Sequence, residues 1–229
     1  MPVRAVILVD NRAREGLERA WGLSVLVEAP GGRVLFDAGP DPEVLCSNAD
    51  SLGVDLSAVE AVVVSHPHRD HYGGLPCVAK HAPGVTVYLP PSPSNLVAWI
   101  RRMGLAPVAV KPRISVAPGA TASEAIHAAI GLWERSLAVE TGKGPLVLLG
   151  CSHPGPSRLV EAALRAVGAE KAWLVMGGLH AAPEEEVDRV MGVSELLAPL
   201  HCSGPAGDYA RARYPGRVLD LAAGDTVEA

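Results

Sequence analysis

The sequence predicts a layered α/β fold in one domain that covers residues 1–229. Short apolar runs, many of them β-branched, alternate with amphipathic segments in both halves of the chain, which is typical of strands followed by helices. Apolar residues make up 48% and charged residues 20% of the chain, a composition that indicates a globular rather than a disordered protein. No internal repeat of roughly 20–50 residues is visible, so a solenoid or a propeller is excluded.

The N-terminal segment predicts a strand and then a hairpin. Residues 1–10 contain an apolar run that is too short for the core of a signal peptide, and no cleavage-site pattern follows it, so it predicts a first strand. Residues 23–28 and 33–37 flank a turn that contains one proline and two glycines, which predicts two strands joined as a hairpin.

The next elements alternate between helices and strands. An aspartate suited to the N-cap, a proline at the first helical position and a closing glycine predict a helix over residues 41–52. Residues 61–64 predict a buried strand, and a helix should follow over 75–81. The remaining predicted strands are 86–89, 146–149, 172–176, 196–200 and 218–221, with short strands within 107–140; the remaining helices are 95–103, 156–167, one from 183 onward, and 208–214.

Histidines are concentrated directly after the strand at 61–64. His66, His68 and His71 lie within six positions, together with Asp70. A proline within this segment and a glycine pair after it predict a loop, in which His66 and His68 point the same way while Asp70 and His71 diverge toward a second point. Imidazole and carboxylate are good ligands for Zn²⁺, so the segment predicts a site for one or two metal ions rather than a solvated loop.

Three strands of the second half each lead into a histidine, namely His153, His180 and His201. Because the C-terminal ends of neighbouring strands meet at one edge of an α/β sheet, we expect these side chains to lie together. The other two histidines are expected outside the site, with His81 as a cation at the end of a helix and His127 as a packed or surface side chain.

These motifs resemble one family. His66-x-His68-x-Asp70-His71 is similar to the metal-binding signature of the metallo-β-lactamase superfamily, and residues 35–39 resemble its first motif, whose aspartate, here Asp37, stabilises the site loop. Residues 150–155, 177–180 and 199–204 resemble a subgroup named after a dihydropterin-ribofuranosylaminobenzene-phosphate synthase. The resemblance implies a four-layer αββα sandwich with the site at one edge between two sheets.

The resemblance also implies a ligand set and a chemistry. It assigns His66, His68 and His153 to a first Zn²⁺ ion and Asp70, His71 and His201 to a second. A water bridging the ions would be deprotonated near neutral pH and attack the substrate, which is metal-assisted hydrolysis.

One position departs from the family pattern. Most hydrolases of the superfamily carry an aspartate that bridges both metals on the strand after the third histidine, whereas here that strand ends in Gly177-Gly178-Leu179-His180. We therefore expect a second ion that is held more weakly and a site that attracts anions. His180 is a candidate for the missing ligand or for the general acid, and both roles stay open; with Asp70 it completes the pair of catalytic candidates.

The four cysteines form no C-x-x-C pair, which predicts free thiols. Cys151 and Cys202 are notable because each lies within two residues of a candidate ligand histidine, and a thiolate is a good ligand for Zn²⁺.

Together these features predict a zinc-dependent hydrolase of a small anionic molecule, with a phosphorylated one expected. The alternatives are a pterin-related synthase or transferase of the subgroup's named type and a non-catalytic metal-binding sensory domain. A net charge of -5 without a Lys/Arg block argues against a nucleic-acid partner. No apolar run reaches the ~18 residues of a membrane span, so a soluble, cytoplasmic protein is expected; the oligomeric state cannot be predicted.

Overall fold

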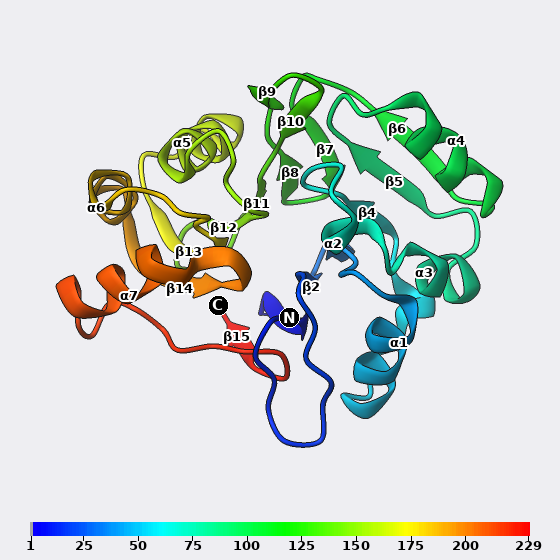
Figure 1. Cartoon of the computed structure of the whole chain (residues 1–229), viewed down its shortest axis with the longest axis horizontal. Helices are drawn as coiled ribbons and strands as arrows, with labels where there is room; N and C mark the ends of the chain where they lie inside the picture. The colour runs from blue at the N-terminus through cyan, green and yellow to red at the C-terminus, as the bar shows by residue number, and fades with distance from the viewer. Residues whose placement is uncertain (1) are drawn as a thin grey trace.

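The computed structural model of the chain describes residues 2–229. Two large sheets pack face to face and helices cover the outer face of each, so the layers follow the order helix, sheet, sheet, helix (Figure 1). The predicted αββα sandwich is therefore confirmed.

The first sheet has seven strands in the order β15-β1-β2-β3-β4-β5-β6. These strands are β1 (Arg4–Val9), β2 (Ser24–Ala29), β3 (Gly32–Phe36), β4 (Ala61–Val63), β5 (Thr86–Leu89), β6 (Ala106–Ala109) and β15 (Thr226–Glu228). The second sheet has six strands in the order β14-β13-β12-β11-β8-β7. These strands are β7 (Ile114–Ala117), β8 (Ala120–Ala122), β11 (Leu137–Val139), β12 (Leu146–Leu149), β13 (Ala172–Gly178) and β14 (Ser194–Leu200). A separate hairpin pairs β9 (Ile126–Ala129) with β10 (Leu132–Glu134).

Each sheet has its own helices, which follow its strands along the chain. Those of the first sheet are α1 (Pro42–Ser51), α2 (Arg69–Tyr72), α3 (Leu75–His81) and α4 (Ser94–Arg102). Those of the second sheet are α5 (Pro156–Val167), α6 (Glu184–Gly192) and α7 (Gly204–Arg213). Two single 3₁₀ turns, η1 (Leu56–Ala58) and η2 (His201–Ser203), complete the chain. None of these helices, within residues 2–229, has the length and apolar character that crossing a membrane requires.

The central strands are buried on both faces, which explains why they appear in the sequence as continuous apolar runs. In β1, Ala5 and Ile7 point into the core between the two sheets, whereas Val6 and Leu8 point into the core beneath α1, α3 and α4. The alternation of side chains along a strand thus supplies both cores from one segment.

Most predicted elements form within a few residues of the expected bounds. In α1 the predicted N-cap Asp41 accepts a hydrogen bond from the backbone N–H of Glu43 at 2.7 Å. The loop expected after β4 contains the short helix α2, and α7 begins at Gly204 rather than at residue 208.

The predicted strand at 218–221 is wrong. Only Val218 bridges to Leu197, because the chain then leaves the sheet toward the opposite one. The last strand is instead β15, which pairs antiparallel with β1. Its three residues contain a single apolar side chain, so the sequence offered no signal for it.

Two of the four cysteines are not free thiols, contrary to the prediction. Cys46 on α1 and Cys77 on α3 form a disulfide, with their Cα atoms 5.9 Å apart. The pair depends on the packing of α1 against α3, which the sequence does not reveal. Cys151 and Cys202 are free, as expected.

Candidate metal centre

The candidate ligands gather at one edge of the sandwich, where strands of both sheets end. His66 and His68 follow β4 of the first sheet, and Asp70 and His71 lie on α2. His153 follows β12, and His201 directly follows β14, both of the second sheet. The structure thus brings the two halves of the predicted ligand set together.

Three ring nitrogens converge in a first group. His66 Nε2 lies 3.1 Å from His68 Nδ1, and His153 Nε2 lies 3.2 Å from the same atom. Each of these two pairs is spaced as two nitrogens on one Zn²⁺ ion with bonds of about 2.0–2.1 Å would be, and His66 and His153 also form with Cys151 a group whose ligating atoms lie within 4.8 Å of one another. Burial lowers the pKa of all three histidines, that of His153 to about 4, so the rings are neutral and can offer lone pairs to a cation.

A hydrogen-bonded chain orients His66 from behind. The Ser65 hydroxyl donates to Asp37 Oδ2 at 2.8 Å, so its oxygen accepts from His66 Nδ1–H at 2.9 Å. The lone pair of His66 therefore sits on Nε2, which faces His68. Such partners behind a ligand fix both its tautomer and its ring orientation.

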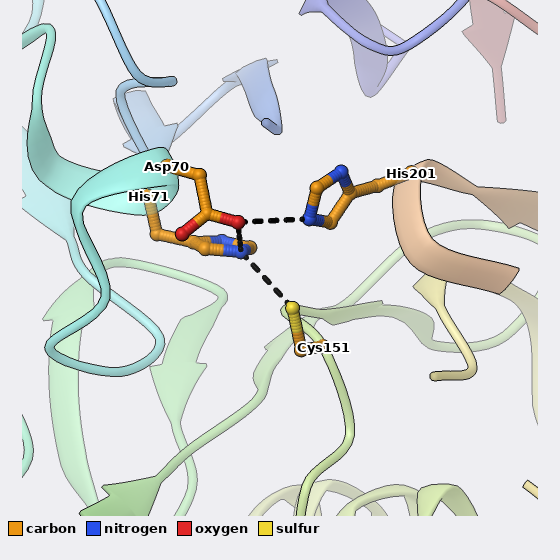
Figure 2. Close-up of side chains that lie close together, drawn as sticks. All are labelled: Asp70, His71, Cys151 and His201. Atoms are coloured by element: carbon orange, nitrogen blue, oxygen red, sulfur yellow. Dashed lines mark hydrogen bonds and ion pairs between the residues drawn. The ribbon is translucent and has the colours of Figure 1, made fainter. Parts of the chain in front are cut away.

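The second group contains Asp70, His71 and His201, shown in Figure 2. Asp70 Oδ2 lies 3.6 Å from His71 Nε2 and 3.2 Å from His201 Nε2. His71 Nδ1 lies 2.7 Å from Asp37 Oδ2, a carboxylate oxygen, so this nitrogen carries the proton and the lone pair is on Nε2. Asp37 thus holds both the site loop and His71, which is the structural position that the first motif predicted.

His201 is held in the same way by Asn11. The Asn11 amide N–H donates to the His201 carbonyl at 2.9 Å. Asn11 Oδ1, 2.9 Å from His201 Nδ1, therefore accepts a hydrogen bond from that ring N–H. The lone pair is then on Nε2, which is buried and makes no hydrogen bond to any residue among 2–229. A bare lone pair 3.2 Å from the Asp70 carboxylate is unfavourable, and a cation between them removes the conflict. The residues of the second group therefore fit a metal ion.

Two buried acids of the site were not identified from the sequence. Glu134 at the end of β10 accepts hydrogen bonds from the backbone N–H groups of Ser152 and His153, both at 2.7 Å, and so holds the loop that carries His153. Burial raises the pKa of Glu134 to about 7, while these two N–H groups oppose the rise. Asp10 after β1 accepts from the backbone N–H of His201 at 2.6 Å. Asp10 directly follows an apolar strand, a pattern from which a site residue could have been predicted. Glu134 lies in a region of weak periodicity, where no such pattern is visible.

Backbone strain is concentrated at this edge. The four non-glycine residues with positive φ among residues 2–229 are Asp37, Ser152, His180 and His201, with φ of 56°, 70°, 48° and 45°. Each lies in the centre or next to a candidate ligand. Such conformations cost free energy and persist where surrounding contacts enforce them, which is typical of functional sites.

His180 lies at the rim rather than in either group. Its side chain is exposed, and its ring centroid is 4.7 Å from that of His153. Its nearest potential ligand group is formed with Cys151 and Cys202. The remaining histidines lie elsewhere: His81 ends α3, and exposed His127 packs against Trp133 on the neighbouring strand.

Comparisons with known proteins identify the family of this chain. The model of the metallo-beta-lactamase superfamily matches residues 22–229. A 7,8-dihydropterin-6-methyl-4-(beta-D-ribofuranosyl)-aminobenzene-5'-phosphate synthase from Methanocaldococcus jannaschii is 25% identical over 238 aligned positions, covering 80% of this chain and 81% of the synthase. This match supports the predicted subgroup.

Two solved structures share the fold over nearly the entire chain. Tm1679, described as a metal-dependent hydrolase of the beta-lactamase superfamily, has a TM-score of 0.76 and 24% identity over 99% of both chains. The metallo-beta-lactamase fold protein YhfI from Bacillus subtilis has a TM-score of 0.73 and 14% identity over 100% of both chains. From the family match, the fold and the residues gathered at its edge, we conclude that this chain belongs to the metallo-β-lactamase superfamily.

Proposed function

We propose that the chain is a zinc-dependent hydrolase of a small anionic, phosphorylated molecule. The observation that carries the proposal is the convergence of five imidazoles and the Asp70 carboxylate from both sheets, with the buried His201 Nε2 left without a hydrogen-bond partner among residues 2–229. One or two Zn²⁺ ions bound there would supply Lewis acidity and lower the pKa of a bound water.

The protein's own contribution is to hold these groups before any ion or substrate arrives. Asp37, Glu134 and Asn11 accept hydrogen bonds from ligand side chains or from the backbone that carries them. Little reorganisation is then needed on binding, which favours both affinity and catalysis. His180, whose ring centroid lies 4.7 Å from that of His153, would give a proton to a leaving group or act as a further ligand.

Charge supports an anionic substrate. With divalent ions bound, the ligand imidazoles would be uncharged and Asp70 would be the one carboxylate of the two groups, so the centre would be positive. Beside α2, a pocket of about 540 Å³ is lined by Arg69, Arg102, Tyr72 and Trp99 among others. Guanidinium groups suit phosphate and aromatic side chains suit a flat ring, so this pocket suits a phosphorylated molecule that carries a ring.

The similarity to the synthase from Methanocaldococcus jannaschii supports a second candidate function, that of a synthase. Its name describes the formation of a product that carries pterin, aminobenzene and ribose phosphate groups. A chain with that activity would join a dihydropterin to a ribofuranosylaminobenzene phosphate, with a leaving group expelled from the dihydropterin as the new bond forms, rather than transfer a phosphorylated group to water.

The two functions and a non-catalytic sensory role can be separated in one experiment. The purified chain, with its zinc content measured, is assayed on phosphomonoesters, phosphodiesters and uncharged esters of the same alcohol, and on the two synthase-type substrates together. We expect turnover of phosphorylated esters that is lost in His68→Ala and kept in His127→Ala, which removes the same side chain at an exposed strand position outside the site. A joined pterin product would favour the synthase, and bound zinc without any turnover would favour the sensory role.

A further inference from the structure

No side chain fits where the family pattern predicts the bridging aspartate. Gly177 has φ of 140°, and a Cβ there would lie 2.1 Å from the carbonyl oxygen of Leu149. At Gly178 a Cβ would lie 2.4 Å from the carbonyl oxygen of Gly150 and 2.7 Å from Cys202 Sγ. The end of β13 is therefore packed directly against the backbone that follows β12, and only glycine permits this approach.

The same approach places Cys151 in the middle of the centre. Its side chain is buried, and Sγ lies 3.2 Å from His71 Nε2 (Figure 2). Sγ belongs to the group formed with Asp70, His71 and His201, in which all ligating atoms lie within 4.8 Å of one another. It also belongs to the group formed with His66 and His153 under the same limit. Within residues 2–229 it is the one side chain common to both groups.

A simpler explanation is that the Cys151 thiol only donates a hydrogen bond to His71 Nε2. That bond would satisfy one lone pair, because a thiol carries one hydrogen. His201 Nε2 would remain buried and without a partner, beside a carboxylate that offers no proton. A cation contacting the thiolate, both imidazoles and the carboxylate satisfies all four groups at once.

We propose that the thiolate of Cys151 bridges the two metal ions, taking the place of the aspartate that β13 cannot carry. The second ion then has four protein ligands, Asp70, His71, His201 and Cys151, and the thiol proton passes to solvent when the metal binds. The thiolate restores the anion that the glycine pair removes, so the second ion is held more firmly than the missing carboxylate implies. A sulfur ligand also favours Zn²⁺ over Mg²⁺ or Mn²⁺. This inference rests on the proposed metal centre but not on hydrolysis.

The most direct test needs no variant. X-ray absorption at the zinc edge of the protein loaded with two Zn²⁺ ions should show a sulfur neighbour at about 2.3 Å besides nitrogen and oxygen at about 2.0–2.2 Å. Replacing Zn²⁺ by Co²⁺ should give a near-ultraviolet charge-transfer band from thiolate to metal. Absence of both signals in the loaded protein would overturn the proposal.

Two matched variants assign the sulfur to its residue. Cys151→Ser should abolish the cobalt band and lower zinc content from two ions toward one, whereas Cys202→Ser, which removes the other free thiol of the same site, should change neither. Cys151→Asp restores a bridging anion, so it should recover metal content without the band. Loss of the band in Cys202→Ser but not in Cys151→Ser would refute the assignment.

Different results would refute the proposed hydrolase function and the Cys151 bridge. A wild-type chain that binds zinc through sulfur but turns over no phosphorylated ester would refute the hydrolase and leave the Cys151 bridge intact. A chain that hydrolyses such esters but shows no sulfur ligand would refute the Cys151 bridge and leave the hydrolase intact. Melting curves of the metal-free variants identify any that do not fold, and the measurements on wild-type protein decide the question in that case.

Discussion

The buried carboxylate of Asp37 provides the sharpest test of how this centre is held. Its Oδ1 accepts from the Ser65 backbone N–H at 2.7 Å, and its Oδ2 accepts from the Ser65 hydroxyl at 2.8 Å and from His71 Nδ1–H at 2.7 Å. Asp37→Asn keeps the shape and can keep the first bond. It places an NH₂ group against the two remaining donors, so both of those hydrogen bonds to a charged group are lost, and the one to His71 can be replaced only by a weaker neutral bond in which the amide donates.

The expected loss of stability in Asp37→Asn follows from these hydrogen bonds. Hydrogen bonds to a charged group contribute about 1.5–3 kcal/mol each and a neutral one about 1 kcal/mol, so losing two and regaining one neutral bond should lower the free energy of unfolding of the metal-free protein by about 2–5 kcal/mol. The new amide also requires His71 to accept at Nδ1, which moves the ring proton to Nε2 and directs it at Asp70 and Cys151. Because Nε2 then has no lone pair for a cation, zinc affinity at the second group should fall by at least roughly 10- to 100-fold.

Urea unfolding in the presence of a chelator measures the first effect, and competition with a zinc indicator measures the second. Asp41→Asn is a matched control, because it makes the same change at the N-cap of α1, where asparagine caps about as well as aspartate. The control should stay within about 0.5 kcal/mol of the wild type and bind zinc normally. Unchanged zinc affinity in Asp37→Asn would refute the proposed orientation of His71.

Three further predictions concern the ions, the disulfide and a helix cap. His68→Ala should abolish activity, whereas His201→Ala should reduce zinc content toward one ion and leave activity that recovers in excess zinc. Elemental analysis and activity assays against zinc concentration measure these effects. Full metal content in His201→Ala would exclude His201 as a ligand. Cys46→Ser opens a loop defined by a sequence separation of 31 and should lower the free energy of unfolding by about 3–4 kcal/mol, and an unchanged urea midpoint would contradict this. Glu186 on α6 accepts from the backbone N–H and hydroxyl of Ser157 at the start of α5, so Glu186→Gln should cost about 1 kcal/mol in urea unfolding at neutral pH. Burial raises the pKa of Glu186, but the hydrogen bonds from Ser157 lower it by more, so the pKa in the folded protein is below the ordinary glutamate value. The stabilisation by Glu186 is therefore present above the ordinary glutamate pKa and is lost as pH falls through the folded value. A destabilisation by Glu186→Gln that grows as the pH is lowered would refute this pH dependence.

The sequence by itself determined the features that depend on neighbouring residues. Alternating strands and helices follow from periodicity, and the histidine cluster after β4 is visible because its four ligand residues lie within six consecutive positions. The role of Asp37 could also be predicted, because the family resemblance links its motif to the loop that begins at Ser65. The resemblance similarly joined His153 and His201 to the cluster before any distance was known.

Only the tertiary structure decided the contacts between residues far apart in the chain. His71 and Cys151 are 80 positions apart, and Asp10 and His201 are 191 apart, so no local pattern links them. Cys151 enters the centre because the glycines of β13 let two strands approach closely, and Glu134 becomes a support because its hairpin lies behind the His153 loop. A sequence records which side chains can bind a metal, but the pairing of distant strands determines which of them face the same point in space.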